Sequence, residues 1–357
     1  MMYKKLFIPG PTHVRDEILQ EMAKPMIGHR GKEYADLQAK VTPKVQKLLY
    51  TENVVFLFAS SSSGVMEGAV RNCVRDGRKV LCTLNGAFAE RWHEMVLANG
   101  KEADVVEVAW GKAITPDLIE AKLSSGEYDA MTLTHNESST GVMNPLHEIS
   151  EVMKKYPDVC WLVDAVSSMG GAKIEVDKLG IDVCIAGVQK AFALPPGLTV
   201  CSVSQKAFDR AKEVKHRGWY FDFLVMLKYY QRNQTPATPS ISHIFALNKQ
   251  MDDILAEGLD ARFQRHIEMA EFTRDWARRH FALYADERYL SNTLTAITNT
   301  RGLSVPELNK ALAEHGAVIG DGYGKLKGQI FRIANMGDLT MDDMRWLTGL
   351  IEEIWNL

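Results

Sequence analysis

Apolar runs of strand length alternate with helix-like segments between about residues 50 and 205 of the chain. Strands that are apolar along their whole length are covered on both faces, which is typical of a mostly parallel sheet flanked by helices. The pattern therefore predicts a wound α/β sheet. The predicted strands are residues 53–59, 79–84, 104–110, 130–135, 160–165, 182–187 and 198–204.

The pattern changes near residue 231. Residues 231–243, QRNQTPATPSISH, are rich in turn-forming residues and indicate a break. A long helical stretch follows, and the remainder alternates short strands and helices, as in a smaller α+β domain. We expect a large domain over 16–250, a small C-terminal domain over 251–357, and a segment over 1–15 that packs on the small domain and the active site.

Composition excludes several classes of function. The chain has 357 residues, of which 46% are hydrophobic and 24% charged, so two or three domains with buried cores can form. A formal net charge of -3 provides no basic surface for nucleic acid. No apolar run approaches the roughly 20 residues that span a bilayer, and the first residues lack the features of a signal peptide. We therefore expect a cytoplasmic protein with no membrane or nucleic-acid partner.

The five cysteines are scattered and form no C-x-x-C pair. Most of them fall in or beside apolar runs, so we expect reduced core cysteines and neither disulfides nor a metal site. They are Cys73, Cys82, Cys160, Cys184 and Cys201.

Three polar features follow or end different predicted strands: the serine-rich loop 60–64, Asp164 and Lys190. Ligands of an open wound sheet bind at the carboxyl ends of its strands, so these features can meet there. Each has an ordinary structural interpretation when taken alone: a helix N-cap for the loop, a capped turn for Asp164, and an Asp164–Lys190 salt bridge for the pair. A carboxylate, an amine and a phosphate cradle together fit one cofactor, pyridoxal 5′-phosphate.

The chemistry of that cofactor explains each group. The lysine forms a Schiff base with the cofactor aldehyde and later moves the α-proton of the substrate. The aspartate keeps the pyridine nitrogen protonated, and the loop holds the phosphate. Phe88, which follows the strand at 79–84, is a candidate for the aromatic ring over the cofactor, although a core phenylalanine fits the same pattern equally well.

On these motifs the chain resembles the class V aminotransferases of pyridoxal-phosphate fold type I, in particular the alanine–glyoxylate and serine–pyruvate group. The matching stretches run in the family's order over essentially the whole chain. They are PGPT (9–12), GHR (28–30), SSSSGVMEGAVRN (60–72), NGAFAERW (85–92), THNESSTGVMNP (134–145), LVDAVSSMGG (162–171), VQKAFALPPG (188–197), QTPATPS (234–240) and FRIANMG (331–337).

The resemblance implies a role for each matching residue. Lys190 is the Schiff-base lysine and Asp164 its pyridinium partner, with Phe88 and Val166 on opposite faces of the ring. The other implied cofactor contacts are Ser62, Ser63, Gln189, Ser138 and Thr238, the last reaching the phosphate of the neighbouring subunit in a homodimer with shared sites. Arg332 is implied to bind the substrate α-carboxylate, with Gly10 and Ser138 also near the substrate.

Three departures from the family pattern affect the expected phosphate contacts. The loop before the helix is an unbroken serine run, where relatives usually carry a glycine and often a threonine or histidine. Val188 stands where relatives often have serine, and Thr235 stands where some have tyrosine. The individual phosphate contacts are therefore the least determined part of the expected site.

The expected activity is transfer of the amino group of a small amino acid, alanine or serine, to a 2-oxo acid such as glyoxylate or pyruvate. A single arginine clamp favours small uncharged side chains, unless Arg30 or the partner subunit supplies a second cation. The alternatives are a transaminase with aspartate or another donor, a cysteine desulfurase-like or other lyase, and a binding protein that has lost catalysis. No cysteine lies beyond Cys201 to serve a desulfurase, and a protein that had lost catalysis would be expected to lose Lys190 or Asp164 first.

Overall fold

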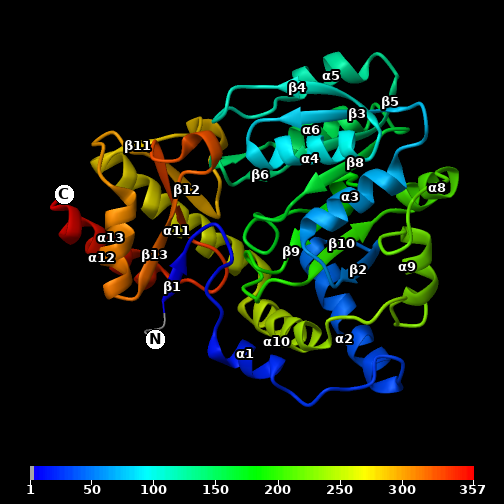
Figure 1. Cartoon of the computed structure of the whole chain (residues 1–357), viewed down its shortest axis with the longest axis horizontal. Helices are drawn as coiled ribbons and strands as arrows, with labels where there is room; N and C mark the ends of the chain where they lie inside the picture. The colour runs from blue at the N-terminus through cyan, green and yellow to red at the C-terminus, as the bar shows by residue number, and fades with distance from the viewer. Residues whose placement is uncertain (1–3) are drawn as a thin grey trace.

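A computed structural model describes residues 4–357 and contains two main sheets that lie side by side (Figure 1). The larger sheet has the strand order β2-β10-β9-β8-β5-β3-β4. Neighbouring strands are parallel except at β10, which runs antiparallel to β2 and β9. Its strands are β2 (Val54–Phe58), β3 (Lys79–Leu84), β4 (Glu102–Glu107), β5 (Tyr128–Thr134), β8 (Cys160–Asp164), β9 (Val183–Gly187) and β10 (Thr199–Val203).

These strands confirm the predicted wound sheet, with one displacement. The strand expected at 104–110 is β4, which begins at Glu102 and ends at Glu107. The strand does not continue to residue 110, because the chain turns over residues 109–112: Lys112 N–H donates to the Ala109 carbonyl at 2.9 Å, and Gly111 has a left-handed φ of 92°.

Both faces of the larger sheet are covered, because successive residues of each strand point to opposite sides. Trp161 and Val163 of β8 belong to one buried cluster, whereas Cys160 and Leu162 belong to the other. The first cluster includes α2 (Lys32–Leu49), α5 (Pro116–Leu123), α6 (Leu146–Met153), α7 (Val176–Leu179) and α10 (Ile241–Glu257). The second includes α3 (Ser62–Cys73), α4 (Ala87–Ala98), α8 (Gln205–Glu213) and α9 (Phe223–Tyr230).

The smaller sheet joins the two ends of the chain. Its order is β1-β13-β14-β12-β11, and β1 (Lys5–Phe7) pairs in parallel with β13 (Ala317–Asp321). The other strands are β11 (Ala282–Leu283), β12 (Leu294–Thr298) and β14 (Ile330–Ala334). The helices α11 (Leu259–His280), α12 (Val305–Glu314) and α13 (Met341–Trp355) contribute to its core.

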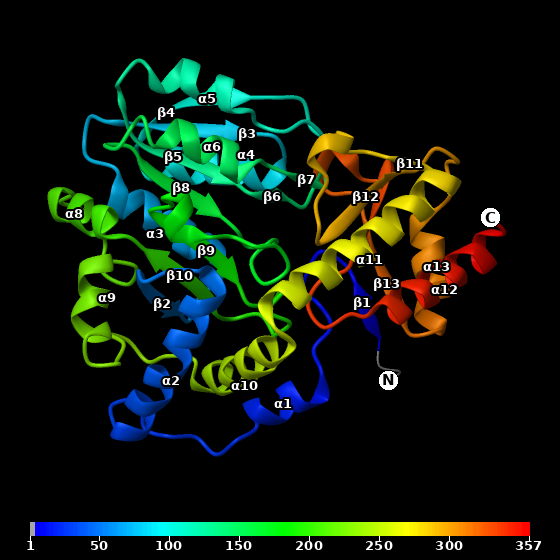
Figure 2. The ribbon, with the colours of Figure 1, turned by 180° about the vertical axis from the view of Figure 1, so that it is seen from behind.

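The connection between the two sheets is helical. Seen from behind, α10 lies beside α2 and α1 (Asp16–Met22), and α11 continues along the smaller sheet (Figure 2). The boundary expected at residue 250 falls inside α10, which ends at Glu257 before α11 begins. Along residues 4–357, no helix combines the length and the apolar composition that crossing a membrane requires.

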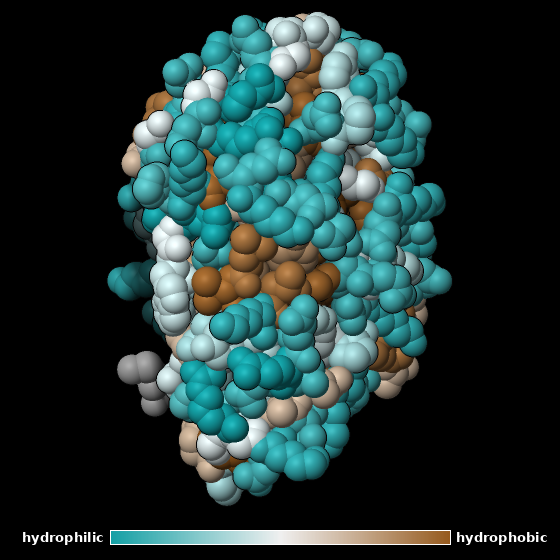
Figure 3. All heavy atoms as spheres, turned by 90° about the vertical axis from the view of Figure 1, so that its right-hand side faces the viewer, coloured by the Kyte–Doolittle hydropathy of each residue, from teal (hydrophilic) through white to brown (hydrophobic). Residues whose placement is uncertain are grey.

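One face of the molecule has an apolar patch. Figure 3 views the side that carries α8 and α9 in Figure 1, and hydrophobic side chains gather near the middle of that face. Just before α9, Trp219 and Tyr220 are 57% and 40% exposed. Leu224 and Val225 of α9 are partly exposed as well.

Candidate active site

The carboxyl ends of five parallel strands, β2, β3, β5, β8 and β9, converge on one cavity of about 360 Å³. Within the range typical of small-molecule sites, this volume accommodates a cofactor-sized ligand. Eight of the residues predicted from the sequence line it: Gly10, Ser62, Ser63, Phe88, Asp164, Val166, Gln189 and Lys190. The larger sheet and the N-terminal segment together therefore bring in residues that are up to 180 positions apart in the chain.

Lys190 lies in a tight turn after β9. Its carbonyl accepts the N–H of Ala193 at 2.8 Å and the Thr12 hydroxyl at 2.9 Å, and its Nζ donates to the Pro9 carbonyl. Gly10 leaves room for the side chain: its φ is 119°, and a Cβ there would lie 2.8 Å from Lys190 Nζ. The N-terminal segment thus forms one wall around the amine.

Burial changes the charge state of Lys190. Withdrawal from solvent lowers the pKa of the amine to about 8, and Arg332 lowers it further while Asp164 opposes the shift. The amine is therefore about half unprotonated near pH 8, whereas an ordinary lysine is almost fully charged there. This is the state that a nucleophile or a proton acceptor needs.

Asp164 lies at the end of β8 and is 5% exposed. Its Oδ1 accepts the backbone N–H of Val166 at 2.8 Å. Burial raises the pKa of the carboxyl to about 7, and this hydrogen bond opposes the shift. Asp164 makes no ion pair with any residue between 4 and 357, so a cationic group in the cavity would stabilise its charged form.

The start of α3 forms an anion cradle with the β9 turn. The N–H groups of a helix's first turn have no intrahelical partner, so those of Ser62 and Ser63 are available to a ligand. Gly187 lies beneath this point, where a Cβ would come within 2.7 Å of Ser62 Oγ and 2.6 Å of Gln189 Oε1. Two hydroxyl groups, an amide and a helix N-terminus thus meet in one place.

Phe88 lies in the first turn of α4, at a position fixed by a buried carboxylate. Glu137 is fully buried, and its Oε2 accepts the N–H groups of Phe88 and Ala89 at 3.0 Å each. Burial raises the pKa of Glu137, and the hydrogen bonds from Ser139, Ala89 and Phe88 counteract the shift. Glu137 belongs to the motif THNESSTG, but the sequence analysis gave it no role.

Arg332 and Ser138 lie together outside the lining of the cavity. Arg332, on β14 of the smaller sheet, is 7% exposed and donates from Nη1 to the Ser138 carbonyl at 2.9 Å. Its Nε donates to the Asp321 carbonyl at 2.9 Å. Burial lowers the pKa of Arg332 to about 10. Ser138 therefore contacts the guanidinium through its backbone in this structure.

Thr238 lies away from this cavity. It is exposed, and it lines a separate small hollow with Ala59 and Tyr220. Of the positions that depart from the family pattern, Val188 is fully buried, and the Thr235 hydroxyl donates to the Ala237 carbonyl at 2.7 Å. Neither of the two faces the cavity that Lys190 lines.

Several lining residues were missed by the sequence analysis. Asn136 lines the cavity, and its Oδ1 is buried without a hydrogen-bond partner. Arg91 follows Phe88 by one helical turn, and Tyr323 reaches across from the loop after β13. The ring of Tyr323 stacks on that of Phe88 with centroids 5.3 Å apart. Asn136 and Arg91 lie within the quoted motifs, whereas no sequence signal marks Tyr323.

The cavity fits the expected pyridoxal 5′-phosphate. The residues that line it match the three functional groups of the cofactor. The helix N-terminus at α3 suits the phosphate, the amine of Lys190 suits the aldehyde, and the carboxylate of Asp164 suits a protonated pyridine nitrogen. The orphaned Oδ1 of Asn136 supplies a further polar contact for a ligand. The unpaired carboxylate and the orphaned oxygen are both explained by a ligand that carries a positive charge and a hydrogen-bond donor.

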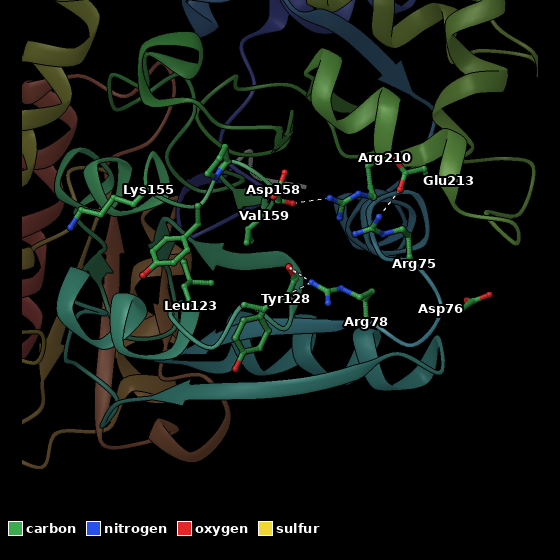
Figure 4. A pocket seen from close by; sticks show the side chains of 13 residues that line it. Arg75, Asp76, Arg78, Leu123, Tyr128, Lys155, Asp158, Val159, Arg210 and Glu213 are labelled. Atoms are coloured by element: carbon green, nitrogen blue, oxygen red, sulfur yellow. Dashed lines mark hydrogen bonds and ion pairs between the residues drawn. The ribbon is translucent and has the colours of Figure 1, made fainter.

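A larger cavity of about 800 Å³ lies at the opposite, amino-terminal edge of the sheet (Figure 4). Its arginines are already occupied: Arg75, Arg78 and Arg210 all form ion pairs with the fully buried Asp129. Ligand sites of wound sheets lie at the carboxyl edge, and this edge carries no lysine with a lowered pKa. We therefore assign the larger cavity a structural role and the smaller one the chemistry.

Proteins similar to this chain in sequence and in fold are aminotransferases. The profile of the Aminotransferase class-V family matches residues 9–324. The chain is 40% identical to an uncharacterized aminotransferase of Methanocaldococcus jannaschii, over 94% of this chain and 88% of that one. It is 33% identical to the L-aspartate–glyoxylate aminotransferase of Paracoccus denitrificans, over 97% and 89%. The crystal structure of an alanine–glyoxylate aminotransferase from Nostoc sp. superposes with a TM-score of 0.93 at 25% identity, covering 99% of this chain and 96% of that one.

Proposed function

Because the chain belongs to the class V aminotransferase family, we propose that its cavity at Lys190 transfers the amino group of a small amino acid to glyoxylate. The enzyme is a pyridoxal 5′-phosphate-dependent aminotransferase. The observation that carries the substrate proposal is a cavity in which one amine of lowered pKa, one buried carboxylate and an anion cradle all face the same space.

Lys190 is the base of the proposed reaction. Bound pyridoxal phosphate supplies an aldehyde that captures the amino nitrogen and a ring that takes up the electrons of the broken Cα–H bond. Lys190 Nζ would hold the cofactor between turnovers and would accept the proton from the substrate Cα. Its lowered pKa leaves the amine free to accept that proton near pH 8.

The other residues bind and orient. Asp164 would keep a proton on the ring nitrogen through its negative charge, and Ser62, Ser63 and Gln189 would bind the phosphate. Phe88 and Val166 would pack against the ring. Arg332 would bind the α-carboxylate through the N–H groups that do not donate to the carbonyls of Asp321 and Ser138. Ser138 is assigned to orient Arg332 and to approach the ring hydroxyl, and Gly10 is assigned to the substrate side of the site.

A desulfurase is the weaker alternative. That chemistry needs a reactive, accessible cysteine near the substrate. All five cysteines of the chain are buried, and none lines the cavity at Lys190. Burial raises the pKa of Cys184 and of Cys201, which makes both thiols poor nucleophiles.

A half-reaction tests the proposed function. Alanine or serine added without a 2-oxo acid should convert the visible absorbance of the bound aldehyde to that of the amine form, with one equivalent of 2-oxo acid released. Glyoxylate should then restore the original spectrum and yield glycine. A lyase would instead release product continuously without any 2-oxo acid acceptor, and that result would refute the proposal.

Asp164→Asn should lower kcat/KM by at least about 100-fold, the size typical of losing one preorganised electrostatic partner. Asparagine keeps an Oδ1 that can accept the Val166 N–H, so the local fold is preserved and only the negative charge is lost. The measurement is steady-state transamination of alanine and glyoxylate, with Asp164→Glu as the charge-retaining control. Wild-type rates in the asparagine variant would contradict the assigned role.

We also propose a homodimer in which each cavity is completed by its neighbour. The apolar face at α9, the exposed Trp219 and the exposed Thr238 support this arrangement, because all three lie away from the chain's own cavity. A large exposed apolar patch often marks a surface that another protein chain covers. In the proposed dimer, Thr238 reaches the phosphate of the partner's site.

Hybrid dimers test the sharing. We expect Lys190→Ala and Thr238→Glu homodimers each to be inactive or nearly so. If the sites are shared, a hybrid of the two subunits contains one intact site and one doubly altered site. Random pairing should then restore about a quarter of wild-type activity. If Thr238 serves its own subunit, no hybrid site is intact and co-expression restores nothing.

A further inference from the structure

Arg91 places a guanidinium group in the lining of the cavity at Lys190, in addition to that of Arg332 nearby. It lies on α4 and is partly buried. Its Nη2 donates to Tyr323 Oη at 2.8 Å, and its guanidinium carbon lies 4.9 Å from the centroid of the Phe88 ring. Among residues 4–357, no carboxylate forms an ion pair with Arg91. A guanidinium has five N–H donors, so most of those on Arg91 remain available.

The two arginines near the cavity are in different environments. Arg332 is almost fully buried and is held by two backbone carbonyls, which suits a fixed clamp for the α-carboxylate. Arg91 lines the cavity, where its side chain donates to Tyr323 Oη and lies over the Phe88 ring. A cation lining a cavity without a counter-ion is most easily explained by an anionic ligand group.

Tyr323 connects the two guanidinium groups. Its hydroxyl accepts from Arg91, and the guanidinium carbon of Arg332 lies 5.8 Å from its ring centroid. Both guanidinium groups thus contact the same tyrosine side chain. A donor with two carboxylates could therefore place one carboxylate on each of them.

Arg91 is also close to the reacting groups. After burial, its positive charge is one of the influences that lower the pKa of Lys190, together with Arg332. Its charge likewise counteracts the effect of burial on the pKa of Asp164. The guanidinium therefore lies within electrostatic reach of both.

We propose that Arg91 binds the distal acidic group of the donor, so that this enzyme takes aspartate in addition to small uncharged amino acids. The proposal rests on the proposed function and specifies its substrate class. In one turnover aspartate leaves as oxaloacetate and glyoxylate leaves as glycine, so the amino group and the electrons balance without a further reactant. A single arginine clamp favours small uncharged donors, and Arg91 would extend this range to aspartate, one of the alternatives that the sequence left open.

The test compares two donors in the full-length enzyme with its cofactor. In Arg91→Gln, kcat/KM for aspartate should fall relative to kcat/KM for alanine, both measured with glyoxylate. The ratio of the two should decrease by about 10-fold or more, the loss expected for a hydrogen bond to a charged group. In Arg91→Lys, which keeps the positive charge but loses the planar guanidinium, the same ratio should decrease less. Arg279→Gln, which removes an exposed arginine of α11 outside the cavity lining, is the control for net charge and should leave the ratio unchanged.

A binding measurement separates this proposal from the proposed function. Succinate should inhibit or stabilise the wild-type enzyme more than propionate does, and Arg91→Gln should remove that difference. If Arg91→Gln lowered kcat/KM for aspartate and for alanine equally, the proposed role of Arg91 would be wrong. The same would follow if the wild-type enzyme were active with alanine but not with aspartate. Failure with every donor would refute the proposed function, and the succinate comparison would still decide whether Arg91 binds a second carboxylate.

Discussion

Lys190→Ala should lower transamination by more than about 10³-fold. The variant loses both the amine that holds the cofactor and the base that moves the α-proton, and general acid–base catalysis by one side chain is worth about 10²–10⁴-fold. No other lysine lines the cavity, so none within residues 4–357 can replace it. The measurement is initial rate with alanine and glyoxylate at saturating cofactor.

The fold should tolerate this substitution. Removing a side chain that is held against Gly10 and the Pro9 carbonyl takes away a desolvated amine, which is itself costly to bury. The melting temperature should therefore stay close to that of the wild type, and a small added amine should restore part of the α-proton transfer. Lys173→Ala, an exposed lysine outside the cavity, serves as the control and should keep full activity. Undiminished activity in Lys190→Ala would remove the mechanism altogether.

The main sheet could be predicted because its strands are buried on both faces. The predicted strand at 79–84 matches β3 residue for residue, and the other strand boundaries lie within three residues of the observed ones. The order of the strands could not be predicted, because local apolar patterns do not encode which strands are neighbours. In a wound sheet, ligands bind at the carboxyl ends of the strands, so the sequence alone predicted that Asp164 and Lys190 lie close together.

The rest of the site depends on tertiary packing. Tyr323 and Arg332 come from the smaller sheet, and nothing in their local sequence says which face of the larger sheet they approach. The local sequence around Arg332 is that of a strand with an exposed charged residue, and only the family resemblance predicted a role for Arg332 in binding substrate. Arg91 was quoted within a motif, but its importance depends on a missing counter-ion that only the structure reveals.

The ion pairs at the amino-terminal edge of the larger sheet could not be predicted from local sequence either. Asp129 follows Tyr128 at the start of β5, where a polar residue usually marks the solvated end of a strand. In the structure it is fully buried, and Arg75 grips it through two side-chain contacts of 2.9 and 2.8 Å (Figure 4 shows the surrounding cavity). Arg78 and Arg210 complete the cluster. Three segments that are distant in sequence are thus joined by one carboxylate.

Asp129→Ala should destabilise the protein by about 3–5 kcal/mol, the cost of removing one partner from a buried ion pair. The loss leaves three arginines without their shared acceptor, including Arg210, which is 8% exposed. Thermal unfolding followed by circular dichroism measures the effect. Glu213→Ala is the matched control, because Glu213 also pairs with Arg75 but is exposed, and it should cost less than about 1 kcal/mol.

The same carboxylate predicts a dependence on pH. Burial alone would raise the pKa of Asp129, but the hydrogen bonds from Arg75 and Arg78 and the charge of Arg210 outweigh it, so the pKa lies below its ordinary value. A lowered pKa in the folded state stabilises the protein above the ordinary value of about 3.9, and this contribution disappears as the pH falls through the folded value. The difference in melting temperature between wild type and Asp129→Ala should therefore be constant from about pH 5 to 8 and shrink in stronger acid. A difference that instead grew with acidity, or a Glu213→Ala variant as unstable as Asp129→Ala, would show that the buried carboxylate is not what joins this edge of the sheet.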